Sequence, residues 1–372
     1  MKRLLLLVLI LAFTGCGHDK DKTETNEEKI ISENRDEKKI EENESNEKSA
    51  ESNPNQNSSD KEVEETKSED ELIKNIDLSL NPNEAGKIMV LMYHNIGEPE
   101  DEWVRTPENF RKDLRYLHEK GYIPISLKDY VSGNIHTPAG KTPYVLTFDD
   151  SNENNFRYLA DGSIDPDCAV GILLEFGKEY PDIIPYCSFF GNGEIPFRVT
   201  GQEREKINFL INNNMDVGNH TVNHPDLTSM SPDEVNYEVG HQAKYLNSLI
   251  DSDYVVNTIA LPFGSRPEDP EAEAQIFKGI YDGMEYENIA VLNVGWDPYL
   301  SPYSKEFDAH AIHRIRASEM MVDGVGIYDW LEYFDHNPEE RFISDGYSEI
   351  ITIPSEYSDQ IENKDGKELF IY

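Results

Sequence analysis

Short runs of apolar residues alternate with longer amphipathic segments from about residue 87 onward. Each run has the length of one buried strand, and these predicted strands cover residues 87–96, 143–150, 184–190, 215–220, 255–264, 289–296 and 310–317. Apolar residues recur at helical spacing between them, which predicts helices over residues 106–122, 165–180, 203–214 and 231–250. Strands that alternate with helices predict an α/β fold with a parallel sheet, as a barrel or a wound sheet, with chemistry at the carboxyl ends of the strands.

Two of the predicted helices begin with N-terminal signals. Thr106 is a predicted N-cap, and Pro107 follows it at the first helical position. Ser231 and Glu234 have the spacing of a capping box.

The N-terminal segment has a different pattern. Residues 1–16, MKRLLLLVLILAFTGC, contain a basic start, an apolar run and a small-residue end, which is the pattern of a signal peptide. The ending LAFTGC resembles a bacterial lipobox, so Cys16 is the predicted lipidation site. An ordinary signal peptide cleaved near Cys16 and a short buried helix are the alternatives. The prediction is an exported lipoprotein, extracytoplasmic and anchored to the bacterial cell membrane.

Residues 17–80 are rich in Glu, Lys, Asn and Ser and nearly free of large apolar clusters. Such a composition cannot bury enough surface to offset the entropy of ordering, so we predict a disordered acidic tether. A single charged helix is the alternative, and Pro54 argues against one that runs throughout. Residues 81–372 then form one domain.

Charge and cysteine content narrow the functional classes. The whole chain has a formal net charge of −39, which argues against a nucleic-acid partner and against electrostatic docking on anionic lipid. Cys168 and Cys187 lie in the domain, where a disulfide and two buried thiols are both open possibilities.

Four polar residues follow two of the predicted strands. Asp149 and Asp150 end the strand PYVLTFDD, and adjacent carboxylates repel unless a cation or a proton compensates them. His220 and His224 stand four residues apart after the strand MDVGNH, a spacing that puts both imidazoles on one side of a helical turn. An isolated pair of this kind is often a surface feature. Together with a strand-end carboxylate it predicts a three-ligand metal site of the type that catalytic zinc prefers.

The sequences TFDD, HTVNH and PFG resemble the first three motifs of the NodB-type polysaccharide deacetylases, carbohydrate esterase family 4. The resemblance implies a distorted (β/α) barrel that removes N- or O-acetyl groups from a polysaccharide. By motif position it implies that Asp149 is the general base and that Asp150, His220 and His224 hold a divalent metal, with zinc as the expected ion.

The chain departs from the family pattern at two motifs. Many members carry an arginine in the third motif, where this chain has Ala260, and this aliphatic variant resembles the branch that acts on β-1,6-linked N-acetylglucosamine polymer. The final motif normally supplies a histidine as general acid. Here HAIHRIRA offers His310 and His313, and we predict His313, with a structural histidine as the alternative. Four further residues are predicted to bind substrate: Pro262, Phe263, Gly264 and Trp296.

These observations predict a membrane-anchored enzyme that hydrolyses N-acetyl groups of an envelope or exported amino-sugar polysaccharide. A poly-N-acetylglucosamine-like polymer is the favoured substrate. Peptidoglycan and O-acetyl xylan are the alternative substrates, and a non-catalytic glycan-binding lipoprotein is the alternative from another functional class.

Overall fold

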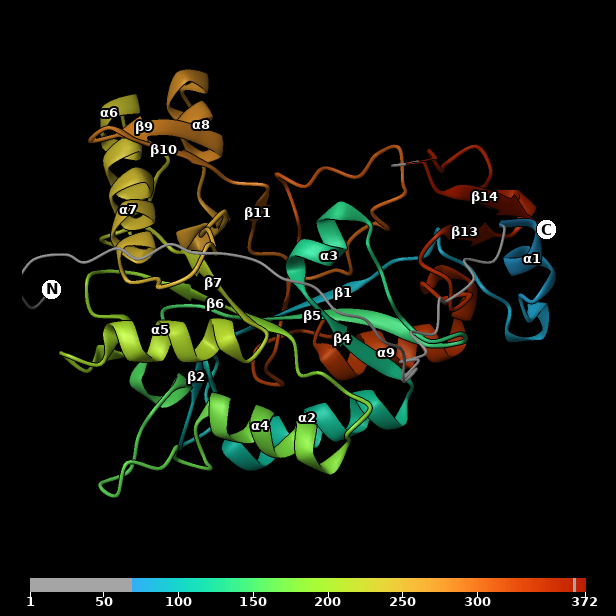
Figure 1. Ribbon diagram of the computed structural model, residues 1–372, viewed down its shortest axis with the longest axis horizontal. Helices are drawn as coiled ribbons and strands as arrows, with labels where there is room; N and C mark the ends of the chain where they lie inside the picture. Colours follow the sequence, from blue (N-terminus) through green and yellow to red (C-terminus); the bar gives the residue numbers. More distant parts are fainter. Residues whose placement is uncertain (1–68, 364–365) are drawn as a thin grey trace, which may run out of the picture. The chain divides into compact units, whose positions relative to one another are not determined.

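The computed structural model describes residues 69–363 and 366–372 (Figure 1). Its centre is an eight-stranded parallel sheet in the order β11-β8-β7-β6-β5-β1-β12, and β4 pairs with β5 beside this path. The strands of this sheet are β1 (Met89–Tyr93), β4 (Tyr122–Ile125), β5 (Thr142–Phe148), β6 (Cys187–Gly191), β7 (Met215–Asn219), β8 (Thr258–Ala260), β11 (Ala290–Leu292) and β12 (Ile315–Arg316).

The two ends of this path meet. Leu292, the last residue of β11, forms a parallel bridge with Ile312, and Gly295 forms another with Ile315 of β12. The sheet is therefore closed into a ring by two bridges where a regular barrel would have a full ladder. The predicted α/β fold and distorted barrel are confirmed by this topology.

Both faces of the sheet are buried, which explains the continuous apolar runs in the sequence. Along β5, Leu146 and Phe148 pack into the cluster beneath the outer helices, whereas Val145 packs into a second cluster with residues such as Val90 and Leu292. Because side chains alternate along a strand, Asp149 continues the face of Val145 and points into the ring.

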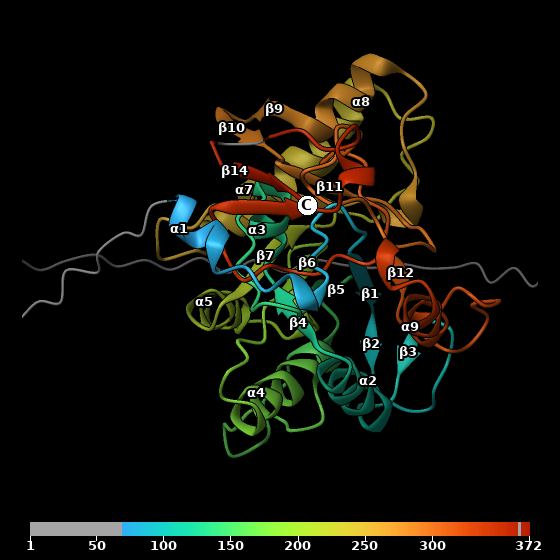
Figure 2. The same cartoon turned by 90° about the vertical axis from the view of Figure 1, so that its right-hand side faces the viewer.

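Helices cover the outside of the ring (Figures 1 and 2). In both views α2 and α4 lie side by side, and Arg111 of α2 is 3.2 Å from Glu175 of α4. The helices are α1 (Glu69–Lys74), α2 (Pro107–Glu119), α3 (Leu127–Ser132), α4 (Ala169–Glu179), α5 (Glu203–Asn212), α6 (Pro232–Asn236), α7 (Gln242–Ser248), α8 (Pro270–Phe277) and α9 (Ile327–His336).

The predicted helix starts are mostly confirmed. The hydroxyl of Thr106 accepts a hydrogen bond from the backbone N–H of Asn109 at the start of α2, and the capping box of Ser231 and Glu234 is formed at α6. The helix predicted from residue 165 begins only at Ala169, because Cys168 has an extended backbone and caps it. The helix predicted over 231–250 contains a π-helical turn, Tyr237–His241, between α6 and α7.

Smaller sheets flank the ring. They are formed by β2 (Asn95–Ile96) with β3 (Val104–Arg105), by β9 (Lys278–Tyr281) with β10 (Met284–Glu287), and by β13 (Ile350–Ile353) with β14 (Glu368–Ile371). The last part of the segment predicted as a disordered tether is structured, since α1 and a 3-10 turn at Leu78–Leu80 lie within it.

Three predictions concern the termini and the cysteines. The signal peptide, Cys16 and most of the tether lie outside the described residues. Within residues 69–363 and 366–372, no helix has both the length and the apolar character needed to span a bilayer. Cys168 and Cys187 are both buried as free thiols, so the structure favours the second of the two possibilities left open by the sequence.

Candidate metal centre

The two carboxylates at the end of β5 point in different directions because the backbone turns there. Asp149 still belongs to the extended chain and is buried, whereas Asp150 and Ser151 adopt positive φ angles of 71° and 45°. Such left-handed conformations are uncommon outside glycine, and they cluster at functional sites. The turn separates the carboxylate of Asp149, inside the ring, from that of Asp150, which is partly exposed at its mouth.

Asp149 is held by Arg314, a fully buried arginine in the segment that enters β12. The two side chains form a bidentate pair, with Nη1 donating to Oδ1 at 2.7 Å and Nη2 donating to Oδ2 at 2.8 Å. Burial alone would raise the pKa of Asp149, but the charge and hydrogen bonds of Arg314, with His220 and His94 nearby, hold that pKa well below its usual range. Asp149 is therefore a fixed, ionised carboxylate.

His220 and His224 lie on the turn that follows β7. His220 is buried and its Nδ1 is 2.7 Å from the carbonyl oxygen of Ala260, whereas its Nε2 is buried without a hydrogen-bond partner. If Nδ1 carries the proton and donates to that carbonyl, Nε2 presents a lone pair, which is the usual arrangement of a metal-binding histidine. Burial also lowers the pKa of His220, which favours the neutral ring that a metal needs.

Asp150, His220 and His224 come together as the sequence predicts. Oδ1 of Asp150 is 3.7 Å from Nε2 of His220 and 3.6 Å from Nε2 of His224. The three potential ligand atoms all lie within 4.8 Å of one another. One carboxylate and two imidazoles suit zinc and related divalent ions, and the unpartnered Nε2 of His220 is the observation that a bound cation would explain. The donor set therefore fits a metal.

Residues that the sequence did not single out position Asp150. Asn192, just after β6, donates from Nδ2 to Oδ1 of Asp150 at 3.0 Å. Arg198 donates from Nη2 to the carbonyl oxygen of Asp150 at 2.8 Å and also to the side chain of Asn192. These contacts fix the carboxylate that would bind the metal.

The π-helical turn Tyr237–His241 positions the other ligand loop. Glu238 is buried and accepts hydrogen bonds from the backbone N–H of Asn223 at 2.8 Å and from its side chain at 2.7 Å. Asn223 directly precedes His224, so Glu238 fixes the turn that carries this ligand. A π-helical turn often marks a functional site, and here it faces the loop of the metal cluster.

His94, which the sequence analysis did not single out, lies close to Asp149. It follows β1, and its Nε2 is 3.9 Å from Oδ2 of Asp149. Its ring meets the ring of Trp103 edge to face, with 4.7 Å between the centroids. His313, the predicted general acid, instead has its Nδ1 3.1 Å from Oδ1 of Asp297. Its role stays a prediction.

The predicted substrate-binding residues occupy two places. Pro262, Phe263 and Gly264 form a 3-10 turn after β8, where the exposed ring of Phe263 lies 4.7 Å from the ring of His224. Phe263 therefore borders the metal cluster. Trp296 lies in an open pocket with Trp103.

The third motif, which lacks an arginine, does not supply the guanidinium that contacts Asp149. Ala260 occupies that position, and its carbonyl contacts His220. Arg266, six residues later, bonds to Asn293, Glu273 and the carbonyl of His310, away from Asp149. The guanidinium next to the carboxylate of Asp149 is that of Arg314, in the segment that enters β12.

Comparison with known proteins agrees with this geometry. Residues 187–277, from the start of β6 to the end of α8, match the family model described as polysaccharide deacetylase. This partial match agrees with the resemblance of the motifs to polysaccharide deacetylases. The matched segment contains His220, His224 and the loop after β8, whereas Asp149 and Asp150 lie before it.

Solved structures of deacetylases are also similar to the chain. The deacetylase PplD of Streptococcus pyogenes, in complex with acetate, is 20% identical over 67% of this chain and 98% of its own, with a TM-score of 0.47. The putative polysaccharide deacetylase BA0330 of Bacillus anthracis is 18% identical over 64% of this chain and 67% of its own (TM-score 0.48). IcaB of Ammonifex degensii is 18% identical over 66% and 97% (TM-score 0.46). No curated protein matches the chain.

Proposed function

We propose that the protein is a metal-dependent deacetylase that hydrolyses N-acetyl groups of an amino-sugar polysaccharide, with a poly-N-acetylglucosamine-like polymer as the favoured substrate. The observation that supports this most directly is the cluster of Asp150, His220 and His224 beside the ionised Asp149. A family of polysaccharide deacetylases that matches part of the chain gives the substrate class.

The proposed roles of the residues follow from their positions. Asp150, His220 and His224 hold the metal, with zinc as the proposed ion, and a bound divalent ion would supply Lewis acidity toward a water molecule and the acetyl carbonyl. Asp149 accepts the proton of the attacking water. Arg314 occupies one lone pair of each carboxylate oxygen and leaves the others free, so the same contact that fixes Asp149 does not block it as a proton acceptor.

A proton must also reach the leaving nitrogen of the sugar. His94 lies beside Asp149 at the end of β1, whereas His313 is paired with Asp297. We propose His94 as the proton donor in place of His313, because it is the imidazole in contact with Asp149 that the metal cluster does not use. Changing each histidine to Gln separates the two assignments. The loss of kcat should be at least tenfold larger for His94→Gln, and the reverse order would restore the assignment to His313.

The first test of the proposed function is acetate release by the full chain with added zinc or cobalt. We would offer β-1,6- and β-1,4-linked N-acetylglucosamine oligomers, peptidoglycan and O-acetyl xylan in parallel. Metal-dependent release from the β-1,6 oligomer is the expected result. Acetate release only from another polymer would show that this polymer, and not the β-1,6-linked one, is the substrate. Metal binding without acetate release from any of them would favour the alternative of a non-catalytic glycan-binding protein.

We also propose that the protein is an exported lipoprotein anchored through Cys16. The sequence of residues 1–16 supports this location. Expression of the chain and of Cys16→Ser in a bacterial host fed with labelled palmitate tests it. Label in the first protein and its absence from the second is the expected result, and equal labelling of both proteins would contradict the lipidation site.

A further inference from the structure

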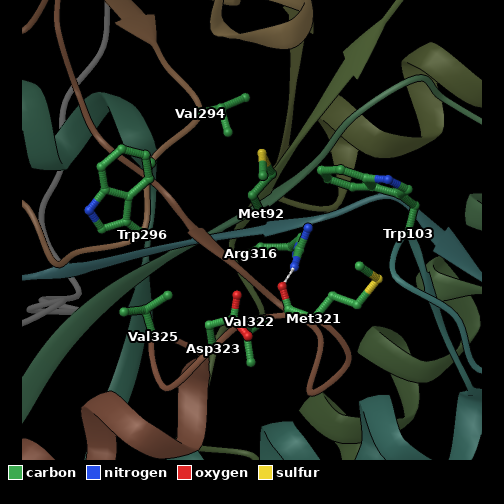
Figure 3. A pocket seen from close by; sticks show the side chains of 10 residues that line it. Met92, Trp103, Val294, Trp296, Arg316, Met321, Val322, Asp323 and Val325 are labelled. Carbon is green, nitrogen blue, oxygen red and sulfur yellow. Dashed lines mark hydrogen bonds between the residues drawn. The ribbon is translucent and has the colours of Figure 1, made fainter.

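A second feature lies beside the metal cluster at the same end of the ring. It is an open pocket with a volume of about 260 Å³ at the carboxyl ends of β1 and β12. Figure 3 shows two tryptophan side chains, Trp103 and Trp296, on opposite sides of this pocket, with Met92 and Arg316 between them. Trp103 is 41% exposed and Trp296 is 66% exposed. Exposed indoles that share one pocket indicate a ligand with apolar faces.

The pocket is held in place by contacts of Arg316. The guanidinium carbon of Arg316 lies 5.0 Å from the centre of the Trp103 ring. The same guanidinium donates to Glu102 and to the backbone carbonyls of Met320 and Met321, the start of the loop that closes one side. The charge of Arg316 is thus compensated by Glu102, which leaves the floor of the pocket suited to a neutral ligand.

The backbone of Trp296 is also fixed by a contact outside the pocket. Its carbonyl oxygen accepts a hydrogen bond from Nε1 of Trp330 on α9 at 2.8 Å, while its own ring projects into the pocket. The exposed carboxylate of Asp323 lies on the loop side of the pocket and makes no hydrogen bond or ion pair within the described part of the chain. It can accept hydrogen bonds from ligand hydroxyl groups.

The pocket is continuous with the catalytic side. Arg314 contacts Asp149, and Arg316, two residues later in the chain, forms the pocket floor. The ring of Trp103 contacts His94, and His94 lies 3.9 Å from Asp149. A polymer with one sugar at the metal cluster therefore reaches the pocket with the next ring or the one after it.

We propose that this Trp103–Trp296 pocket binds a neighbouring pyranose ring of the same polysaccharide and so makes the enzyme select oligomers over single sugars. The inference rests on the proposed function for the identity of the polymer. A pyranose with equatorial substituents has two faces of C–H groups that pack on indole rings, while its hydroxyl groups point to the rim, where Asp323 lies. Met92 and Met321 add apolar surface that adapts to the ring.

The chain has only three tryptophans, Trp103, Trp296 and Trp330, which allows a direct test. Labelling with 5-fluorotryptophan gives three ¹⁹F resonances, assigned by single Trp→Phe variants. The Asp149→Asn protein is titrated with a β-1,6-linked N-acetylglucosamine hexamer and with the monosaccharide, so that binding is observed without turnover. We expect the hexamer to shift the Trp103 and Trp296 resonances at concentrations where the monosaccharide does not, and to shift Trp330 least.

A substitution gives the matching affinity measurement. Trp296→Ala should raise the Kd for the hexamer about tenfold, as loss of one aromatic contact does, and Trp296→Tyr should recover part of that loss. Ile280→Ala removes an exposed apolar side chain of β9 that does not line the pocket and should leave the Kd unchanged.

The outcomes separate the pocket from the proposed function. Acetate release with no movement of the Trp103 and Trp296 resonances would overturn the proposal that the pocket binds a sugar ring and would leave the proposed deacetylase activity intact. Movement of both resonances without acetate release from any polymer would support glycan binding and overturn the enzyme. Equal movement with hexamer and monosaccharide would overturn the selection of oligomers.

Discussion

Two pairs of acids lie at buried or partly buried positions of the protein, and the repulsion and burial of their carboxyl groups are offset in different ways. Asp149 and Asp150 stand at the end of β5, where Arg314 neutralises the first and a donor set for a cation surrounds the second. Glu84 and Asp345 are buried together beside β13, and no arginine or lysine forms an ion pair with either of them in the described part of the chain. The first pair is built to remain charged, and the second is not.

The second pair relies on hydrogen bonds and on protonation. Thr352 donates its hydroxyl to Asp345 at 2.6 Å, and its backbone N–H donates to Glu84 at 3.3 Å. Burial is the main cause that raises the pKa of Glu84 well above its usual range and the pKa of Asp345 to about 6, and the repulsion between them adds to the effect on Glu84. Such a pair serves packing between the N-terminal segment and the C-terminal sheet.

Burial of acids alone therefore does not identify a catalytic site in this fold. Two features distinguish the site. A buried arginine, Arg314, pairs with one carboxylate, and a potential metal ligand without a hydrogen-bond partner, Nε2 of His220, lies beside the other.

Removing the charge of Asp149 should have the largest effect. Asp149→Asn keeps the shape of the side chain but removes the proton acceptor, so kcat for acetate release should fall by about 10²–10⁴-fold, with one metal ion still bound per chain. Glu84→Gln is the matched control, because it also replaces a buried acid by its amide, and it should retain kcat. Turnover by Asp149→Asn within a fewfold of the parent would refute the role of this carboxylate.

Removing the cation should cost stability as well as activity. Arg314→Met leaves Asp149 buried without its partner, and breaking a buried ion pair in this way costs about 3–5 kcal/mol. The free energy of unfolding, measured in urea on metal-free protein, should recover in the double variant Asp149→Asn with Arg314→Met. Additive losses in the double variant would show that the two side chains do not depend on each other.

The site could be predicted from the sequence only where its signals are local. Asp149, Asp150, His220 and His224 each end or follow an apolar run, and parallel strands bring those ends to one edge of the ring. Arg314 gives no such signal, since its partner Asp149 is 165 residues away in the chain. An arginine in an otherwise apolar strand segment only indicates that a partner must exist.

The fold shows the same limit. The ring strands with long apolar runs were predictable, whereas β4 is short, contains Pro124 and pairs only with β5, so it gives little periodic signal. The π-helical turn Tyr237–His241 was read as ordinary helix, because its spacing differs by one residue within a single turn. Both features depend on neighbours that are distant in sequence.

The pair of Glu84 and Asp345 should make the stability of the protein depend on pH. Because the pKa of Asp345 is raised to about 6 in the folded protein, the folded state holds a proton that the unfolded state releases between about pH 4 and pH 6. Its contribution to stability is therefore complete below about pH 4 and is lost as the pH rises through 6.

Asp345→Asn removes this dependence. Relative to the parent, the free energy of unfolding of the variant should rise by on the order of 2–3 kcal/mol between pH 4 and pH 8. Urea unfolding of metal-free protein at both pH values measures it. Parallel changes in parent and variant would show that Asp345 titrates in the folded protein as it does in water.

Changing Glu238 should have the smallest effect of these substitutions. It tests how the loop that carries His224 is held beside Asp150. Glu238→Gln replaces an acceptor of two hydrogen bonds from Asn223 by an amide that cannot accept at both positions, so the turn that carries His224 loses its support. Loss of a residue that orients a metal ligand weakens metal affinity by about 10–100-fold. Titration with Co²⁺, followed by its visible absorption, measures the affinity.

Glu234→Gln, which changes an exposed glutamate in the preceding helix α6, is the control and should bind Co²⁺ as the parent does. Equal Co²⁺ affinity in the two variants would mean that the turn holds His224 without Glu238. A loss of Co²⁺ affinity in Glu238→Gln alone would show that metal binding beside Asp149 and Asp150 also depends on a residue that touches neither the metal nor the substrate.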